Sequence, residues 1–107
     1  MSSFDDHASG SEAQFVQNQA FEFKAAANRN RMMGLWAGEK MGLAGDSLEN
    51  YAKAVVRVDQ DQPSEDDVIR KILGDLVASN LTVRESEVRT KAAEFLAQAR
   101  EALKGEA

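Results

Sequence analysis

The sequence contains no cysteine, a single proline and a single histidine. Without cysteine there can be no disulfide, no thiolate metal site and no thiol nucleophile. Because His7 is the one histidine, a metal centre built from several histidines is excluded as well. No stretch approaches the roughly 18 consecutive apolar residues of a membrane-spanning helix. The N-terminus lacks the basic and apolar regions of a secretory signal. We therefore expect a cytoplasmic protein that does not insert into a membrane.

Positive charge is also in short supply. The chain has 13 Lys and Arg residues against 18 Asp and Glu residues, so its net charge is −5. This balance disfavours nucleic acid as a partner, because a nucleic-acid-binding surface needs a basic stripe. The 107 residues, 43% of them apolar, suffice for one modest hydrophobic core. With so few helix breakers, the composition favours an all-α domain.

The first residues differ in composition from the rest of the chain. Apart from Phe4, residues 1–11 are small or polar, and residues 9–11 are Ser, Gly and Ser, which disfavour helix. We expect residues 1–11 to form a disordered, flexible arm in the free protein. Residues 12–107 are expected to form one compact four-helix bundle.

Glycine and proline divide this domain into helices. Gly42 and Gly45 mark the first turn, and Pro63 lies at the second. Between these breaks the apolar residues recur at helical spacing. The sequence predicts helices over about 12–42, 47–60, 65–79 and 83–104.

Capping signals mark several of these helix ends. Asp46 and Glu49 have the spacing of a capping box, and Ser64 precedes three acidic residues that suit the positive end of a helix dipole. Asn80 is suited to a left-handed cap at the end of the third helix. Short connections between these helices predict antiparallel neighbours.

The helical stripes also predict a core. The polar residues Gln19 and Asn30 interrupt the apolar stripe of the first helix. Gly34, Gly38 and Gly42 lie four residues apart, which predicts a close approach of another helix beside Trp36. The expected core residues are Phe23, Met33, Leu35, Trp36, Leu48, Tyr51, Val55, Ile69, Ile72, Leu73, Leu76, Val88, Phe95, Leu96 and Leu103.

The sequence contains no catalytic constellation of residues, so it does not indicate an enzyme. Residues 59–63 begin like a calcium loop, but Pro63 stands where a ligand is needed, and the carboxylates are better interpreted as turn and cap residues. A basic group follows the arm: Lys24, Arg29, Arg31 and Lys40. These cations suit a phosphate or an acidic partner, or simply a solvated helix face.

Taken together, several short runs resemble the zeta-subunit family, the small inhibitor proteins of the F-type ATP synthase in alphaproteobacteria. The likeness covers residues 4–77 and rests on the order and spacing of the runs. They are Phe4-Asp5-Asp6, Glu12-Ala13-Gln14-Phe15, Phe23-Lys24-Ala25, Arg29-Asn30, Gly34-Leu35-Trp36-Ala37, Tyr51-Ala52-Lys53, Val55-Val56 and Asp67-Val68-x-Arg70-Lys71.

This resemblance implies a regulatory inhibitor whose N-terminal segment inserts into the catalytic head of the synthase and blocks ATP hydrolysis and rotation. It implies no required cofactor and weak binding of adenine nucleotide. It assigns the inhibitory contact to Phe4, Asp5, Asp6, Glu12, Ala13 and Phe15, extended to Phe23 and Lys24. For the nucleotide, the candidates are Lys24, Arg29, Arg31 and Lys40.

Two other functions remain open from the residues themselves. One is a helical sensor that binds a nucleotide or another anion through the basic group. The other is a helical adaptor for a different protein. Under the leading interpretation we expect a protein that is monomeric when free and peripheral to the membrane-bound synthase.

Overall fold

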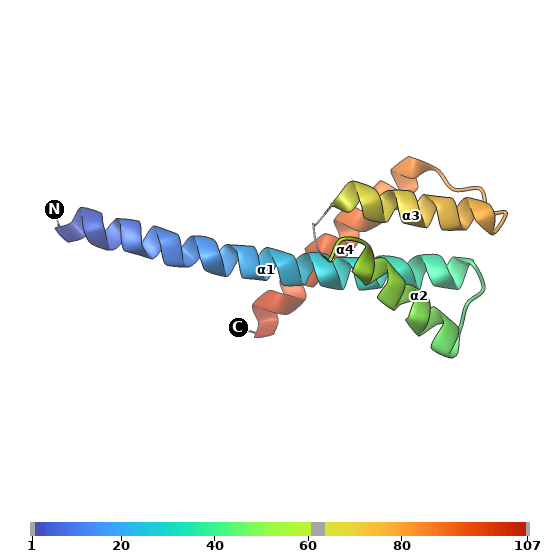
Figure 1. Cartoon of the computed structure of the whole chain (residues 1–107), viewed down its shortest axis with the longest axis horizontal. Helices are drawn as coiled ribbons and strands as arrows, with labels where there is room; N and C mark the ends of the chain where they lie inside the picture. Colours follow the sequence, from blue (N-terminus) through green and yellow to red (C-terminus); the bar gives the residue numbers. More distant parts are fainter. Residues whose placement is uncertain (1, 61–63, 107) are drawn as a thin grey trace.

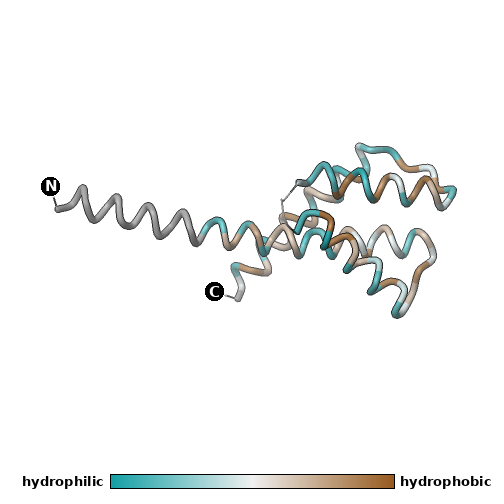
Figure 2. The backbone as a smooth tube through the Cα atoms, viewed as in Figure 1, coloured by the Kyte–Doolittle hydropathy of each residue, from teal (hydrophilic) through white to brown (hydrophobic). Residues whose placement is uncertain are grey.

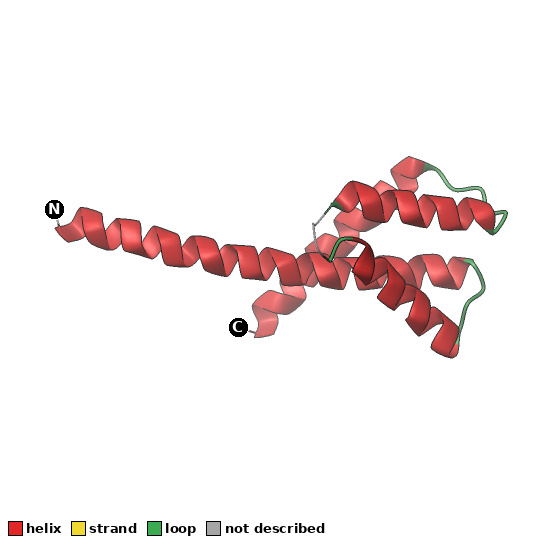
Figure 3. Cartoon of the chain, viewed as in Figure 1, coloured by secondary structure: helices red, strands yellow, loops and turns green. Residues whose placement is uncertain are grey.

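Four α-helices make up the part of the chain that this computed structural model describes, which is the backbone of residues 2–60 and 64–106 and the side chains of residues 18–60 and 64–105. They are α1 (Ser2–Lys40), α2 (Gly45–Val58), α3 (Glu65–Ala78) and α4 (Glu85–Glu106) (Figure 1). No strand occurs within those residues (Figure 3). The expected all-α class and four-helix architecture are confirmed.

The helix ends agree with the sequence-based boundaries to within two residues, except at the start of α1. There the helical backbone begins at Ser2 instead of near residue 12, and it continues through residues 9–11. The expected turn at Pro63 lies outside the described residues. Disorder of residues 1–11 in the free protein stays a prediction, because a helix without packing partners is marginal in water even where helical geometry is allowed.

Helix α1 organises the molecule. It contacts all three other helices along its C-terminal part, whereas its N-terminal part extends beyond them (Figure 1). As a result the molecule measures 63 Å along its longest axis and only 25 and 23 Å across. We call residues 2–21 the projecting segment and the rest of the described chain the body.

The core lies inside the body, where apolar residues of α2 and α3 recur at helical spacing (Figure 2). Six of the expected core residues are fully buried: Met33, Val55, Ile69, Ile72, Leu76 and Val88. The expectation for Phe23 is wrong, because 53% of this residue is exposed. It lies on α1 near the point where the projecting segment leaves the body, too close to the edge for other helices to cover it.

Small residues bring α1 and α2 into close contact. A Cβ atom added to Gly34 would lie 2.7 Å from the Ala52 Cα atom, and one added to Gly38 would lie 2.5 Å from Leu48 Cδ1. The predicted close approach is therefore confirmed at these two glycines. Gly42 has another role, because its φ of +83° belongs to the turn after α1.

The caps agree with the sequence at two of three places. Ser64 Oγ accepts a hydrogen bond from the Asp67 backbone N–H at 3.4 Å, and Asn80 adopts a φ of 63°. The cap expected at Asp46 is wrong: α2 already begins at Gly45, and its N-cap residue Ala44 makes no side-chain cap. The Glu49 side chain instead accepts hydrogen bonds from an arginine of α1.

Glycine-to-alanine substitutions test the close contact between α1 and α2. We expect Gly34→Ala to lower the free energy of unfolding by about 1–2 kcal/mol, since overpacking against a backbone atom outweighs the gain in helix propensity. Gly74→Ala is the matched control, because an added Cβ there meets nothing within 4 Å. It should raise the free energy by about 0.5–1 kcal/mol. Urea denaturation measures both, and a stabilised Gly34→Ala variant would contradict the packing described.

Candidate functional site

A buried polar cluster occupies the position where α1 meets the end of α2 and the start of α3. Its members Arg29, Asn30 and Asp59 are 5%, 0% and 6% exposed. Arg29 Nε donates to Asn30 Oδ1 at 3.0 Å, and Asn30 Nδ2 donates to Asp59 Oδ1 at 2.7 Å. The side chain of Asn30 thus links the arginine to the carboxylate across two helices.

Charge adds to these hydrogen bonds. Arg29 Nη1 lies 3.4 Å from Glu65 Oε2 on α3, and Arg29 Nη2 lies 3.7 Å from Oδ2 of Asp59, the residue that follows α2. A buried charge is costly unless it is paired, so each member of this cluster needs the others. The cluster therefore fixes the register of α1 against both neighbouring helices.

A second ion pair lies at the base of the projecting segment. The Arg100 guanidinium of α4 donates to the Glu22 carboxylate from Nε at 3.1 Å and from Nη2 at 2.8 Å. Its hydrogen bond to Glu22 raises the pKa of Arg100 above the ordinary value for arginine. This pair is exposed and contributes little stability. It shows that α4 still contacts α1 at Glu22.

The structure separates the four basic residues for which the sequence suggested anion binding. Arg29 belongs to the buried cluster. Arg31 donates to both carboxylate oxygens of Glu49 at 2.9 Å, and this hydrogen bond lowers the pKa of Glu49. Lys40 lies 3.8 Å from a Glu87 carboxylate oxygen on α4 and stacks over the Trp36 ring. Lys24 is exposed.

Three of these cations thus face acids on three different helices instead of one shared site. Their role in nucleotide binding stays a prediction. In the described part of the chain, no group of three or more acidic or histidine side chains is placed to hold a metal ion. Among those residues, no helix has the length and apolar character needed to cross a membrane.

The residues assigned to the inhibitory contact divide into two groups. The side chains of Phe4, Asp5, Asp6, Glu12, Ala13 and Phe15 lie outside the described residues, although the backbone of all six belongs to the projecting segment. Phe23 and Lys24 are described, and both are exposed just beyond the base of that segment. One helix therefore carries both groups in sequence.

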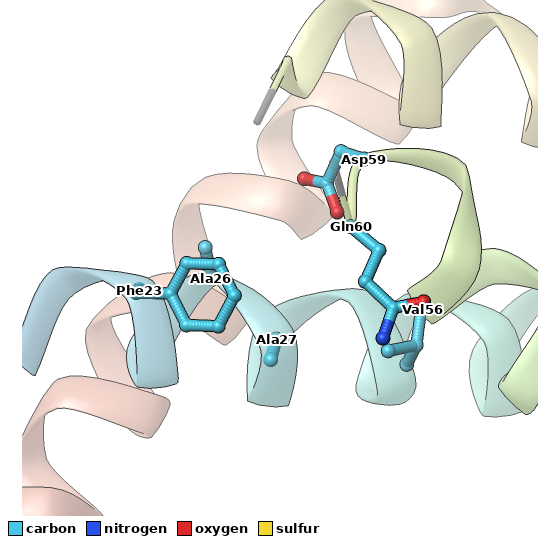
Figure 4. A pocket seen from close by; sticks show the side chains of 6 residues that line it. All are labelled: Phe23, Ala26, Ala27, Val56, Asp59 and Gln60. Carbon is cyan, nitrogen blue, oxygen red and sulfur yellow. The ribbon is translucent and has the colours of Figure 1, made fainter. Parts of the chain in front are cut away.

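An apolar hollow lies beside Phe23. Its lining comes from one face of α1 and from the C-terminal end of α2 (Figure 4). The six lining residues are Phe23, Ala26, Ala27, Val56, Asp59 and Gln60. Sequence reasoning missed both this hollow and the buried cluster next to it. One residue could have indicated the cluster from the sequence. Asn30 is a polar residue within an apolar helical stripe, and the structure shows that it is fully buried.

Known proteins resemble this chain over most of its length. The model of the family described as ATPase inhibitor subunit zeta matches residues 1–102. The chain belongs to this family. A solution NMR structure with 42% sequence identity covers 80% of this chain and 98% of its own, with a TM-score of 0.67. No curated protein matches the chain.

Family membership confirms the resemblance inferred from the short runs. The matched residues include both the projecting segment and nearly all of the body. The chain is thus a member of an inhibitor-subunit family, and a regulatory role fits it.

Replacing the buried arginine tests the cluster. We expect Arg29→Met to lower the free energy of unfolding by about 3–5 kcal/mol, because it leaves Asp59 buried without its cation. Arg31→Met, the same change on the exposed pair with Glu49, should cost less than about 1 kcal/mol. Chemical denaturation followed by circular dichroism gives both values. Similar small losses in the two variants would show that the cluster does not hold α1.

Proposed function

We propose that this protein is a regulatory subunit that binds the F-type ATP synthase and inhibits its hydrolysis of ATP. The observation that carries the proposal is the match of the inhibitor family to residues 1–102, which takes in the projecting segment as well as the body. The shape of the molecule adds support, since one helix extends well beyond the other three (Figure 1).

The proposed mechanism is steric. A single α-helix with its side chains is about 10–12 Å wide, so the projecting segment fits a crevice between subunits. The whole molecule is 25 and 23 Å across, so the body is too wide to follow. In this proposal the segment enters the catalytic head between the nucleotide-binding subunits and the rotor. The body stays outside as a stop, and rotation in the direction of hydrolysis is blocked.

The connection between segment and body suits this role. Helix α1 runs from Ser2 to Lys40 without interruption, so a load on the segment passes directly into the body. There the buried contacts of Arg29 and Asn30 with Asp59 oppose sliding of α1 along its neighbours. The synthase would supply the apolar partner surface that an isolated helical segment lacks.

The finer assignments belong to the same proposal. The inhibitory contact begins with Phe4, Asp5 and Asp6 and continues along the segment. The exposure of Phe23 supports extending that contact to the base of the segment. The free protein would be a monomer, and binding would place it at the periphery of the membrane-bound synthase. The anion-sensor alternative has less support, because Arg29, Arg31 and Lys40 already face acids.

Deleting residues 1–14 tests the steric mechanism. The body should keep its thermal midpoint, because the described core begins at Ala25. Inhibition should be lost, because the remaining segment is too short to reach into the head. The test is a dose–response curve of ATP hydrolysis by the synthase of the same organism, with circular dichroism as the folding control.

The full chain carrying Gly74→Ala serves as a control for substitution in the body and should inhibit like the unmodified protein. Equal inhibition by the truncated and full chains would overturn the insertion mechanism. Absence of inhibition by the full chain at every concentration would overturn the proposed function itself.

A further inference from the structure

Two segments line the hollow beside Phe23, and each contributes three residues with the same spacing along the chain. From α1 come Phe23 and the two alanines three and four residues later. From the last turn of α2 comes Val56, and from the turn that follows α2 come Asp59 and Gln60, at the same spacing. In Figure 4 the Phe23 ring lies on one side of Ala27, and Val56 and Gln60 lie on the other. The volume is about 120 Å³. This is well below the roughly 300–1,000 Å³ of small-molecule pockets and suits one inserted side chain.

One polar group at the hollow is incompletely satisfied. Among the described residues Asp59 Oδ2 is buried and has no hydrogen-bond partner. Its nearest cation is Arg29 Nη2 at 3.7 Å, which is too long for a hydrogen bond. Buried carboxylate oxygens almost always have a donor, so this oxygen needs an explanation. It lies on a residue that lines the hollow.

The charge balance around Asp59 points to the same missing group. In the described part of the chain, Arg29 is the one cation that contacts both Asp59 and Glu65, and these three side chains together carry a net charge of −1. A second cation at the hollow would balance the cluster, and its N–H groups would supply the missing donor. An uncharged apolar side chain would do neither.

We propose that the hollow is a docking site for an arginine side chain of a partner protein. Its aliphatic stem packs on Ala26, Ala27 and Val56, and its guanidinium lies against the Phe23 ring and donates to Asp59 Oδ2. Guanidinium is favoured over ammonium because it is planar, stacks on aromatic rings and is more weakly hydrated. Because Oδ2 is buried in the free protein, the arginine reaches it through a small shift of the Asp59 side chain that keeps the hydrogen bond from Asn30 Nδ2 to Oδ1.

The position of the hollow allows a partner that binds the projecting segment to contact the body as well. It adjoins the base of the projecting segment, so a partner that holds the segment reaches the hollow with its own surface. The body would then be fixed in orientation as well as stopped. The assignment of this arginine to the synthase rests on the proposed function. The affinity of the hollow for an arginine side chain is independent of the proposed function.

The isolated interaction is tested with N-acetyl-arginine N-methylamide as the probe. Titrated into the ¹⁵N-labelled full chain, it should shift the amide signals of residues 23–27 and 56–60, with a dissociation constant on the order of millimolar. The norleucine analogue, which has a similar stem without charge, should bind at least about tenfold more weakly. Equal binding of the two probes, or no shifts in these residues, would overturn the proposal.

Matched variants connect the hollow to inhibition. Ala27→Leu fills the hollow and should abolish the probe-induced shifts, whereas Asn28→Leu places the same side chain at an exposed neighbouring position and should preserve them. If Ala27→Leu fails to fold, Phe23→Ala carries the test, because it removes an exposed wall. On the synthase, the variant that blocks probe binding should weaken inhibition about tenfold.

The two arms separate the possible failures. Loss of probe binding with unchanged inhibition would leave the arginine site intact and overturn its use by the synthase. Probe binding that survives both Ala27→Leu and Phe23→Ala would overturn the site itself. Absence of inhibition by the unmodified chain would overturn only the proposed function.

Discussion

The ion pair between Arg29 and Asp59, held in place by Asn30, is the interaction on which the arrangement of this molecule depends. It joins α1 to the end of α2, and Glu65 extends it to the start of α3. An apolar contact at this place would specify the position of α1 along its neighbours less strictly, because the hydrophobic effect is not directional. Hydrogen bonds between buried polar groups have a fixed geometry, and breaking them is costly. They therefore fix the position of α1 relative to the end of α2 and the start of α3.

This register has consequences at both ends of the cluster. Toward the C-terminus of α1 it aligns Gly34 and Gly38 with α2, so that the helices approach closely. Toward the N-terminus it leaves Phe23 exposed beside an apolar hollow and directs the remaining helix away from the body. The same few residues thus connect the packing of the core with the surface proposed for a partner. The chain belongs to the inhibitor family, and under the proposed function the segment enters the synthase while the body stays outside.

The sequence was sufficient for the class of fold, the number of helices and most of their ends, because glycine, proline and capping residues act locally. Ser64 and Asn80 illustrate this, since their roles depend only on neighbouring residues. Asn30 and Phe23 illustrate the limit. A helical stripe identifies a face, but whether a residue on it is buried depends on where another helix ends. The polar Asn30 is therefore fully buried and the aromatic Phe23 is not. The basic residues Arg29, Arg31 and Lys40 likewise do not form one site, because the acidic partner of each lies on a different helix.

Residue-resolved amide hydrogen exchange of the free protein tests most directly the central claim that α1 is one helix, anchored at the buried cluster and extending beyond the other helices at its N-terminal part. The account predicts slow exchange from Asn30 to Ala37, close to the limit set by global unfolding, because these residues belong to the anchored core. Protection should fall steeply toward Glu22, and residues 2–11 should exchange rapidly, since no tertiary contact stabilises that part of the helix. Uniformly slow exchange along the whole of α1, or rapid exchange at Asn30, would contradict it.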